Sequence, residues 1–385
     1  MAPLNGIRVL DLTRLLPGPF ASLVLADLGA QVDKLEDSGG GDYMRLTPPL
    51  VGSMSAGFHA LNRGKRSLVL DLKKPEGVAA FKRLVKSYDV VFEQFRPGVL
   101  ERFGCGHDAL LAENPRLVVC ALTGYGQQGP LAQRAGHDLN YLARSGLLGL
   151  MGPTEGAPQI PSFQLADVSG GLWSVVAILA ALRERDQTGK GRFLDIGMID
   201  SVIPFGTVVL SRLLGGELPA RGNEILTGGI APYNTYLTKD GESMSLGSLE
   251  PKFLMKFCQG AGIEVDMSAL LPGPHQAALK QRFAEVFASR TRAAWEAFNE
   301  QHDCCLEPVL RPDELRADPH LSARGVFFDV ETGDGVVGQF RTPVTPRDLE
   351  ARPAPAQGEH TDAILAECGF SEEEIAALKS EGATR

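Results

Sequence analysis

The sequence predicts an α/β protein whose larger domain is an open, mainly parallel sheet of the Rossmann type. Two observations lead to this prediction. In the first half of the chain, short apolar runs alternate regularly with segments of helical spacing. The 385 residues, 44% hydrophobic and 22% charged, are also enough for two domains or for one domain with a large insertion. The loop after the first predicted strand, TRLLPGP at 13–19, lacks G-x-G-x-x-G, and G-x-x-x-x-G-K-[ST] does not occur in the sequence, so we do not expect a dinucleotide or a nucleotide phosphate to bind there in the usual way.

The expected elements of the first half come in a regular order. Strands are predicted at 7–12, 30–35, 67–72, 89–93 and 116–122, with helices at 19–29 and 75–87 between them. The helix at 19–29 ends at Gly29, a typical C-terminal cap. This alternation is what predicts the parallel sheet.

In the second half of the chain we expect a smaller domain to interrupt the first one, after which the chain returns to the first domain. A long apolar helix is expected at 170–185, and a block of different composition runs from about 222 to 308, with a hairpin around Asp240-Gly241. A strand at 326–330 then marks the return, and 343–358 reads as a Pro-rich loop. The last helix, 371–379, begins with a capping box formed by Ser371 and Glu374.

Composition excludes several classes of protein. The 38 Lys and Arg residues against 47 Asp and Glu give a net charge of −9, so no general binding to nucleic acid or to an anionic membrane is expected. The six cysteines are scattered without C-x-x-C, and the seven histidines lack H-x-x-x-H spacing, so we expect neither a disulfide scaffold nor a metal site. The apolar stretch 196–214 carries Asp200, Pro204 and Arg212 and is a poor membrane span, and residues 1–6 do not begin a signal peptide. We expect a reduced, cytoplasmic enzyme with no membrane association.

Polar residues in glycine-rich turns are the candidates for chemistry. The sequence around Gly136 reads GHDLNY, and QLADVSGG at 164–171 leads into the apolar helix. Asp167 then occupies the expected N-cap position, where free N–H groups of the helix stabilise negative charge. Taken alone, Asp167 is as well explained as a cap, and His137 as a structural histidine, so the residues by themselves leave a site undecided.

Across nearly the whole chain the sequence resembles the family III CoA-transferase superfamily, and within it the α-methylacyl-CoA racemases. The matching segments, in order, are LNGIRVLDL at 4–12, NRGKRS at 62–67, FRPGV at 95–99, GHD at 136–138, LAD at 165–167, GGIAPY at 228–233, GSLEPKF at 247–253, DPH at 318–320 and GEHT at 358–361. The transferases use an aspartate at the Asp167 position as nucleophile, under a glycine-rich loop that is missing here at 246–250. The racemases have a histidine at the His137 position and a glutamate at the Glu250 position, as this chain does.

The resemblance implies a mechanism that interconverts (2R)- and (2S)-2-methylacyl-CoA thioesters. Inverting the α-carbon requires one group to remove its proton on one face while another returns a proton on the other, with no metal or redox cofactor. His137 and Asp167 would form this pair, Glu250 would orient the histidine, and N–H groups at the start of the helix near Gly170 would stabilise the enolate oxygen. Asp138 is an alternative partner of the histidine, or a structural turn residue.

Coenzyme A, as part of the substrate, would be the only cofactor-like group. Matching the racemases gives as its candidate contacts Asp71, Leu72, Lys73, Gln94, Phe95, Arg96, Arg102, Gly136, Asp138, Asn140 and Tyr141, with Arg63, Lys65 and Arg66 as weaker candidates. The chain departs from the commoner family pattern at Gln94, often Asn or Gly, and at Asp37, where a basic residue can contact CoA.

The resemblance also implies a domain division and an assembly. The large CoA-binding domain would comprise 1–200 and 325–385, the small α+β domain 225–320, with linkers at 201–224 and 321–324. Two chains would form an interlocked homodimer, with Glu250 of one chain joining His137 and Asp167 of the other. Two alternatives remain: a CoA-transferase with Asp167 as nucleophile, and a non-catalytic acyl-CoA-binding protein that has kept the fold.

Overall fold

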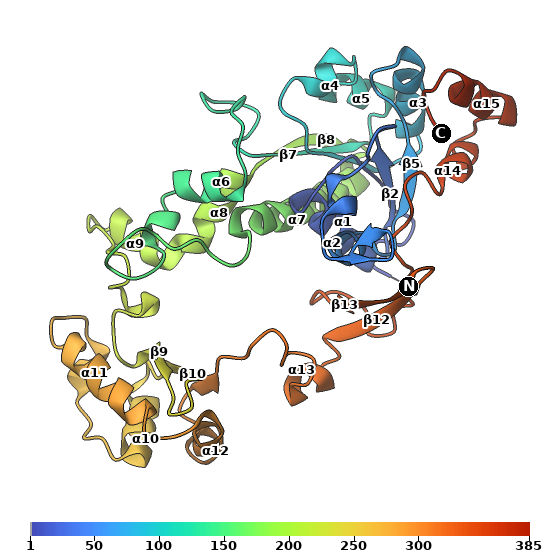
Figure 1. Cartoon of the computed structure of the whole chain (residues 1–385). Helices are drawn as coiled ribbons and strands as arrows, with labels where there is room; N and C mark the ends of the chain where they lie inside the picture. Colours follow the sequence, from blue (N-terminus) through green and yellow to red (C-terminus); the bar gives the residue numbers. More distant parts are fainter. Residues whose placement is uncertain (1) are drawn as a thin grey trace. The chain divides into compact units, whose positions relative to one another are not determined.

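The structure is a computed structural model that describes residues 2–385, which form two compact units (Figure 1). Unit 1 comprises Met1–Ser145, Phe163–Phe205 and Pro319–Arg385, and unit 2 comprises Gly146–Ser162 and Gly206–Asp318. The chain therefore leaves unit 1 twice and returns to it twice.

A six-stranded sheet, in which all neighbouring strands are parallel, forms the centre of unit 1 and confirms the predicted fold class. Its order is β5-β2-β1-β6-β7-β8, with β1 Arg8–Asp11, β2 Gln31–Glu36, β5 Arg66–Val69, β6 Val90–Glu93, β7 Val118–Thr123 and β8 Arg192–Gly197. The chain builds outward from β1 to β5 and then crosses back to β6, so the strand order reverses between β1 and β6. Such a switch point leaves a crevice at the carboxyl ends of the two strands.

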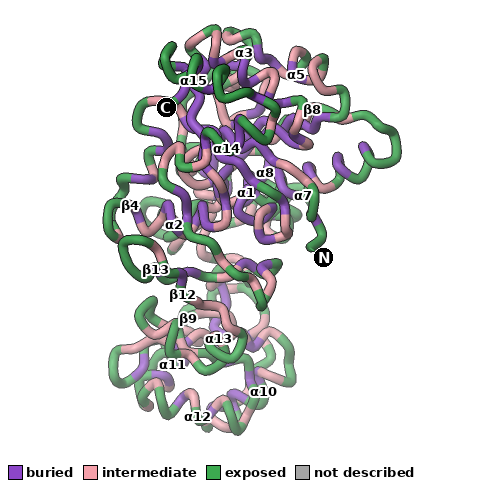
Figure 2. The backbone as a smooth tube through the Cα atoms, turned by 90° about the vertical axis from the view of Figure 1, so that its right-hand side faces the viewer, coloured by how far each residue is buried: buried purple, intermediate pink, exposed green. Residues whose placement is uncertain are grey.

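Alternating side chains along the strands cover both faces of the sheet. Leu10, Val91 and Val119 belong to a hydrophobic core that includes side chains of α3 (Pro75–Val85), α5 (His107–Glu113), α14 (Thr361–Glu367) and α15 (Glu372–Ser380). Their neighbours Val90 and Val118 are equally buried and point to the other face, where α1 (Pro17–Asp27) and α7 (Leu165–Thr188) lie. Figure 2 shows the buried backbone gathered around α1, α8 and α14.

The remaining elements of unit 1 are short. They are the turns of 3₁₀ helix η1 Tyr43–Leu46 and η3 Ile203–Gly206, the hairpin β3 Leu50–Val51 and β4 Met54–Ser55, helices α2 Ala56–Asn62, α4 Val99–Arg102, α6 Asp138–Arg144, α8 Met198–Val202 and α13 Pro319–Ala323, and the hairpin β12 Phe327–Thr332 and β13 Gly335–Phe340. The capping box of the last helix is confirmed: Ser371 Oγ accepts the Glu374 N–H at 3.2 Å, and Glu374 Oε2 accepts the Ser371 N–H at 2.8 Å.

Unit 2 is an α+β body with its own core. Its three-stranded antiparallel sheet has the order β11-β10-β9, from Leu306–Pro308, Ser243–Gly247 and Tyr233–Leu237, and the β9–β10 pair confirms the predicted hairpin. Its helices are η2 Leu148–Leu150, α9 Thr207–Leu214, η4 Ile225–Thr227, α10 Pro251–Ala261, η5 Met267–Leu270, α11 Gln276–Phe287 and α12 Arg292–His302. Phe257, Phe287 and Trp295 are completely buried between the helices and the sheet.

The long apolar helix begins earlier than predicted. α7 starts at Leu165, five residues before the expected start, because Gly170 and Gly171 serve close packing rather than initiation. A Cβ atom on Gly171 would lie 2.7 Å from the Pro17 carbonyl oxygen of α1, and one on Gly170 would lie 2.7 Å from Met198 Cγ of α8. Among the described residues α7 alone is long and apolar enough to cross a membrane, but half of its most apolar window is buried inside the protein, as in an ordinary core helix.

Two of the weaker CoA-contact candidates are internal ion-pair partners, which corrects their assignment. Arg63 is 2% exposed and pairs with Asp27 at 2.7 Å. Lys65 is 3% exposed, and its Nζ donates to Ser22 Oγ at 2.7 Å and to Asp11 Oδ2 at 3.4 Å. Burial alone would raise the pKa of Asp11, but Lys65 and Lys34 lower it below its usual value. Lys65 also donates to the Pro19 carbonyl of α1 at 3.0 Å, and Lys34 donates to the Thr13 carbonyl at 2.7 Å, so this network fixes the end of β1, the loop that follows it and the start of α1.

Removing one member of this network is predicted to be costly. Lys65→Met keeps the side-chain volume but leaves the Asp11 carboxylate buried without its nearest cation, so we expect a loss of about 3 kcal/mol in the free energy of unfolding, measured by urea titration. In the double variant D11N/K65M no charge is stranded, and we expect it to be more stable than K65M alone. Strictly additive losses would contradict this reading of the network.

Candidate functional site

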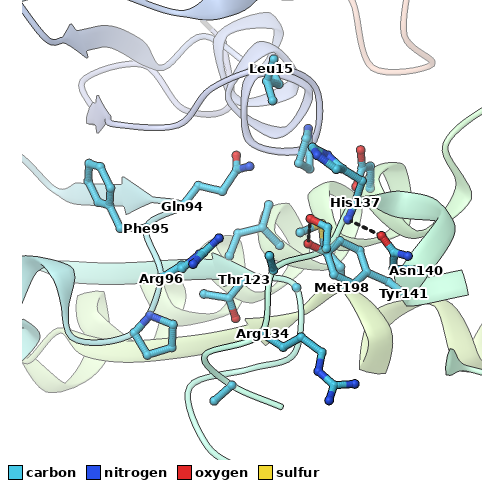
Figure 3. A pocket seen from close by; sticks show the side chains of 18 residues that line it. Leu15, Gln94, Phe95, Arg96, Thr123, Arg134, His137, Asn140, Tyr141 and Met198 are labelled. Carbon is cyan, nitrogen blue, oxygen red and sulfur yellow. Dashed lines mark hydrogen bonds between the residues drawn. The ribbon is translucent and has the colours of Figure 1, made fainter.

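A cavity of about 450 Å³ opens in unit 1 at the carboxyl edge of the large sheet (Figure 3). Loops that follow four parallel strands reach it: Leu15 comes after β1, Gln94 after β6, Gly124 after β7 and Met198 after β8. It therefore lies where the strand order predicts a binding crevice. Its lining is Leu15, Pro17, Gln94, Phe95, Arg96, Pro97, Leu122, Thr123, Gly124, Ala132, Arg134, Ala135, Gly136, His137, Asn140, Tyr141, Asp167 and Met198.

His137 stands at the entrance of α6 with its backbone fixed on both sides. Asn140 Oδ1 accepts the His137 N–H at 3.0 Å, the dashed contact in Figure 3, and the His137 carbonyl accepts the Asn140 N–H at 2.8 Å. Tyr141 donates its hydroxyl hydrogen to the Gly136 carbonyl at 2.5 Å. A Cβ atom on Gly136 would lie 2.7 Å from the Tyr141 ring, so only glycine allows this approach. The imidazole itself is exposed to the cavity.

Asp138, the first residue of α6, caps α7 from outside. Its Oδ1 accepts the backbone N–H groups of Ala166 at 2.7 Å and of Asp167 at 3.1 Å. Because the first N–H groups of a helix have no partner within it, this carboxylate supplies what a local N-cap side chain would supply. Asp138 thus joins the start of α6, which carries His137, to the start of α7, which carries Asp167.

This contact corrects two expectations. Asp167 is not the N-cap of its helix, because Gln164 occupies that position and Asp167 lies in the first turn. The N–H groups near Gly170 are not available as an oxyanion hole either, because Gly170 lies inside the helix and the N–H groups of Ala166 and Asp167 already donate to Asp138.

Asp167 is the titratable group of the cavity whose environment is most altered. Burial raises the pKa of its carboxyl group to about 7, and the nearby carboxylate of Asp138 adds to the rise. At neutral pH the group is therefore present both as an acid and as a base. This is the property that general acid–base catalysis requires, and an ordinary exposed aspartate lacks it.

The turn after β6 brings polar side chains into the cavity. In Figure 3 Gln94 and Arg96 extend into it, whereas Phe95 points to the opposite side. Gln94 Oε1 and Thr123 Oγ1 are buried in the wall without a hydrogen-bond partner in the described part of the chain. Buried polar atoms are almost always hydrogen-bonded, so these two atoms indicate where a ligand would donate or accept.

The cavity gathers only part of the predicted CoA-contact set. Gln94, Phe95, Arg96, Gly136, Asn140 and Tyr141 line it, whereas Arg102 is an exposed residue of α4. Leu72 is 8% exposed within the core, and Asp71 Oδ1 accepts the Lys73 N–H at 3.0 Å, away from the cavity lining. Glu250 is an exposed residue at the start of α10 in unit 2.

Sequence reasoning missed Leu15, Arg134 and Met198, all of which line the cavity. A signal was available for Leu15, since it follows the first strand of a predicted parallel sheet. Met198 was hidden because β8 was not predicted: Arg192 and Asp195 interrupt its apolar pattern. Among residues 2–385 no group of three or more His, Cys, Asp or Glu side chains is arranged to hold a metal ion.

Comparison with known proteins places these features in a family. The model of CoA-transferase family III matches residues 4–361. The chain is 40% identical to the human α-methylacyl-CoA racemase, over 98% of this chain and 96% of that protein. It is also 36% identical to the succinate–glutarate CoA-transferase of Agrobacterium fabrum, over 95% of each chain. The crystal structure of a CaiB/BaiF family protein from Brucella suis superposes with a TM-score of 0.83 at 32% identity, covering 95% of this chain and 99% of that one.

The position of Asp138 predicts how the pKa of Asp167 responds to substitution. In Asp138→Asn the amide oxygen still accepts a hydrogen bond, but the negative charge is gone, so ionisation of Asp167 becomes easier and its pKa should fall below about 7. It should stay above the usual aspartate value, because burial is the larger cause. An NMR titration that follows the carboxyl carbon of Asp167 in the parent protein and in D138N measures both pKa values. D186N, an exposed aspartate near the other end of α7, should leave the pKa unchanged, and an unchanged or higher value in D138N would contradict the prediction.

Proposed function

The chain belongs to CoA-transferase family III, and from this premise we propose that it is an α-methylacyl-CoA racemase. The reaction would interconvert (2R)- and (2S)-2-methylacyl-CoA thioesters by moving the α-proton through an enolate. The observation that carries the proposal is the presence of His137 and Asp167 in the wall of one cavity. Identity alone does not decide, because transferases are nearly as similar to the chain as racemases.

The two groups suit a reaction that must run in both directions. In one direction His137 takes the α-proton from one face while Asp167, protonated, delivers a proton to the other; in the reverse direction the roles exchange. Histidine titrates near neutral pH by nature, and burial brings the pKa of Asp167 to about 7. A carboxyl group that is partly protonated at neutral pH can act as the acid in one direction and as the base in the other, as a racemase requires.

The cavity also offers contacts for a CoA ester. Arg96 and Arg134 lie in its lining and would meet the negative charge of a polyphosphate ligand. The unpartnered Gln94 Oε1 would accept a hydrogen bond from an amide N–H of the pantetheine arm. Thr123 Oγ1 would donate a hydrogen bond to an amide carbonyl of that arm. CoA would be part of the substrate, and no separate cofactor is proposed. A cytoplasmic location is proposed from composition alone.

The second candidate function is acyl-CoA:carboxylate CoA transfer with Asp167 as nucleophile. Its support is the set of transferases among the relatives, such as the Agrobacterium enzyme. A carboxylate attacks only when it is deprotonated, and a pKa of about 7 leaves Asp167 half-protonated at neutral pH. Transfer also assigns no role to His137. The missing role for His137 favours the racemase, whereas a carboxyl group that is half-deprotonated at neutral pH is available for either reaction.

A homodimer is proposed together with the activity. Large apolar side chains are exposed along one stretch of unit 1: Phe163, Leu172, Trp173, Val176 and Phe205 are 60%, 39%, 41%, 54% and 53% exposed. Such a surface is typical of an interface, and a second copy of this chain is the occupant we propose. That the two chains interlock, and that Glu250 of one orients His137 of the other, rests on the family resemblance.

Substitutions at the pair separate the two candidate functions. Asp167→Ala should abolish either activity, whereas His137→Ala should lower racemisation by a factor of about 10²–10⁴, the usual contribution of a general base, and spare acyl transfer. Proton NMR of a 2-methylacyl-CoA in deuterated water, without an acceptor acid, follows loss of the α-proton signal. Arg144→Gln, on the exposed side of α6, serves as the matched control. Interconversion of the two enantiomers by H137A at the parent rate, measured by the loss of optical purity, would eliminate the two-base mechanism.

Interlocking has a kinetic signature of its own. If each chain passes through the other, two differently tagged dimers cannot exchange subunits unless one chain unfolds. We expect no mixed dimers after days at native conditions and a statistical mixture after joint refolding from urea, both measured by native mass spectrometry. Rapid exchange would rule out interlocking, and a monomer at micromolar concentration would rule out the dimer.

A further inference from the structure

Glu93 is a buried acid at the edge of the cavity that the proposed chemistry does not use. It is the last residue of β6, 2% exposed, and directly precedes the turn that carries Gln94 and Arg96. Its Oε2 accepts the backbone N–H of Phe95 at 2.6 Å. The carboxyl group therefore holds the middle of the turn from behind the cavity wall.

His107 fixes Glu93 in turn. The His107 Nε2 lies 3.3 Å from Glu93 Oε1, and the imidazole stacks on the Phe193 ring of β8 with 3.8 Å between ring centroids. Burial raises the pKa of Glu93, while His107 and the Phe95 N–H act in the opposite direction. Both oxygens of this buried carboxyl group thus have a partner, one on α5 and one in the turn.

The geometry of the turn links this support to the cavity. Side chains alternate along it: Gln94 and Arg96 extend into the cavity in Figure 3, and Phe95 extends to the other side, where it packs against the hydrophobic core. A change in the backbone at Phe95 therefore moves both cavity-facing neighbours together.

The hydrophobic core behind this turn would pack without a buried carboxyl group. Burying an ionisable group costs free energy that an apolar side chain of similar size avoids. In Glu93 this cost is offset by the contacts with the Phe95 N–H and with His107, and these contacts hold the turn at 94–96 in position.

We propose that Glu93, held by His107, is a positioning residue that sets Gln94 and Arg96 for binding the CoA part of the substrate. The proposal rests on the proposed function only in that the ligand is a CoA ester. It holds equally for a racemase and for a transferase.

Calorimetric titration with CoA itself tests the proposal without any turnover assay. Glu93→Ala should weaken CoA binding about tenfold, as expected when a well-formed hydrogen bond of the binding turn is lost. Glu93→Gln keeps an acceptor for the Phe95 N–H and should stay within about threefold of the parent. D33N, a fully buried carboxylate on β2 paired with Arg66, serves as the matched control and should change stability but not CoA affinity.

A double-mutant cycle separates positioning from a merely structural role. In the Q94A/R96A background the side chains that Glu93 positions are gone, so Glu93→Ala should weaken CoA binding less than twofold there. If E93A does not fold, His107→Phe, which keeps the stack on Phe193, replaces it and should weaken binding about threefold with the same dependence on background. Unchanged CoA affinity in E93A, or an equal loss in both backgrounds, would overturn the proposal. Absence of CoA binding by the parent protein would instead contradict the proposed function.

Discussion

The parallel order of the six strands is the constraint on which the site depends. Because the carboxyl ends of β1, β6, β7 and β8 meet at one edge, four loops far apart in the sequence reach a common cavity without any long connection. The reversal of strand order between β1 and β6 leaves that edge open. Charged side chains hold three of these four loops. Lys34 fixes the loop after β1, Glu93 fixes the turn after β6, and Asp138 ties the segment beyond β7 to α7.

The Asp138 carboxylate links structure to chemistry more directly than the other supports. By accepting the N–H groups of Ala166 and Asp167 it satisfies the start of α7, which stabilises the helix. The same negative charge lies close enough to Asp167 to oppose its ionisation. Asp138 therefore both stabilises the start of α7 and contributes to the raised pKa of Asp167 in that helix. The alternative of a helix N-terminus left free for an oxyanion would have had the opposite effect, because unpaired N–H groups lower the pKa of a nearby carboxyl group.

The fold was predictable because its signals are local, and the site was only partly so. Apolar runs such as Val90 to Phe92 specify buried strands directly, and Ser371 with Glu374 specifies a helix start over four residues. Asp138 caps a helix 28 residues away, a relation that no local pattern carries. Arg63 and Lys65 are weaker CoA-contact candidates by resemblance, and only the tertiary structure shows their buried partners. His137 and Asp167 were chosen by resemblance; their composition and spacing alone left them undecided.

Family members of similar identity differ in activity, and the cavity suggests a physical reason. Burial at the start of α7 is the larger cause of the raised pKa of Asp167. The raised pKa therefore follows mainly from how the fold packs around this residue. A transferase needs that carboxyl group alone, whereas a racemase needs a second group on the opposite face of the carbon. In the proposed racemase reaction the second group would be His137, an exposed residue whose backbone is hydrogen-bonded to Asn140. An exposed side chain is free to vary without a cost in stability. Under the proposed function, His137 rather than Asp167 would therefore decide between the two reactions, because the fold constrains His137 less.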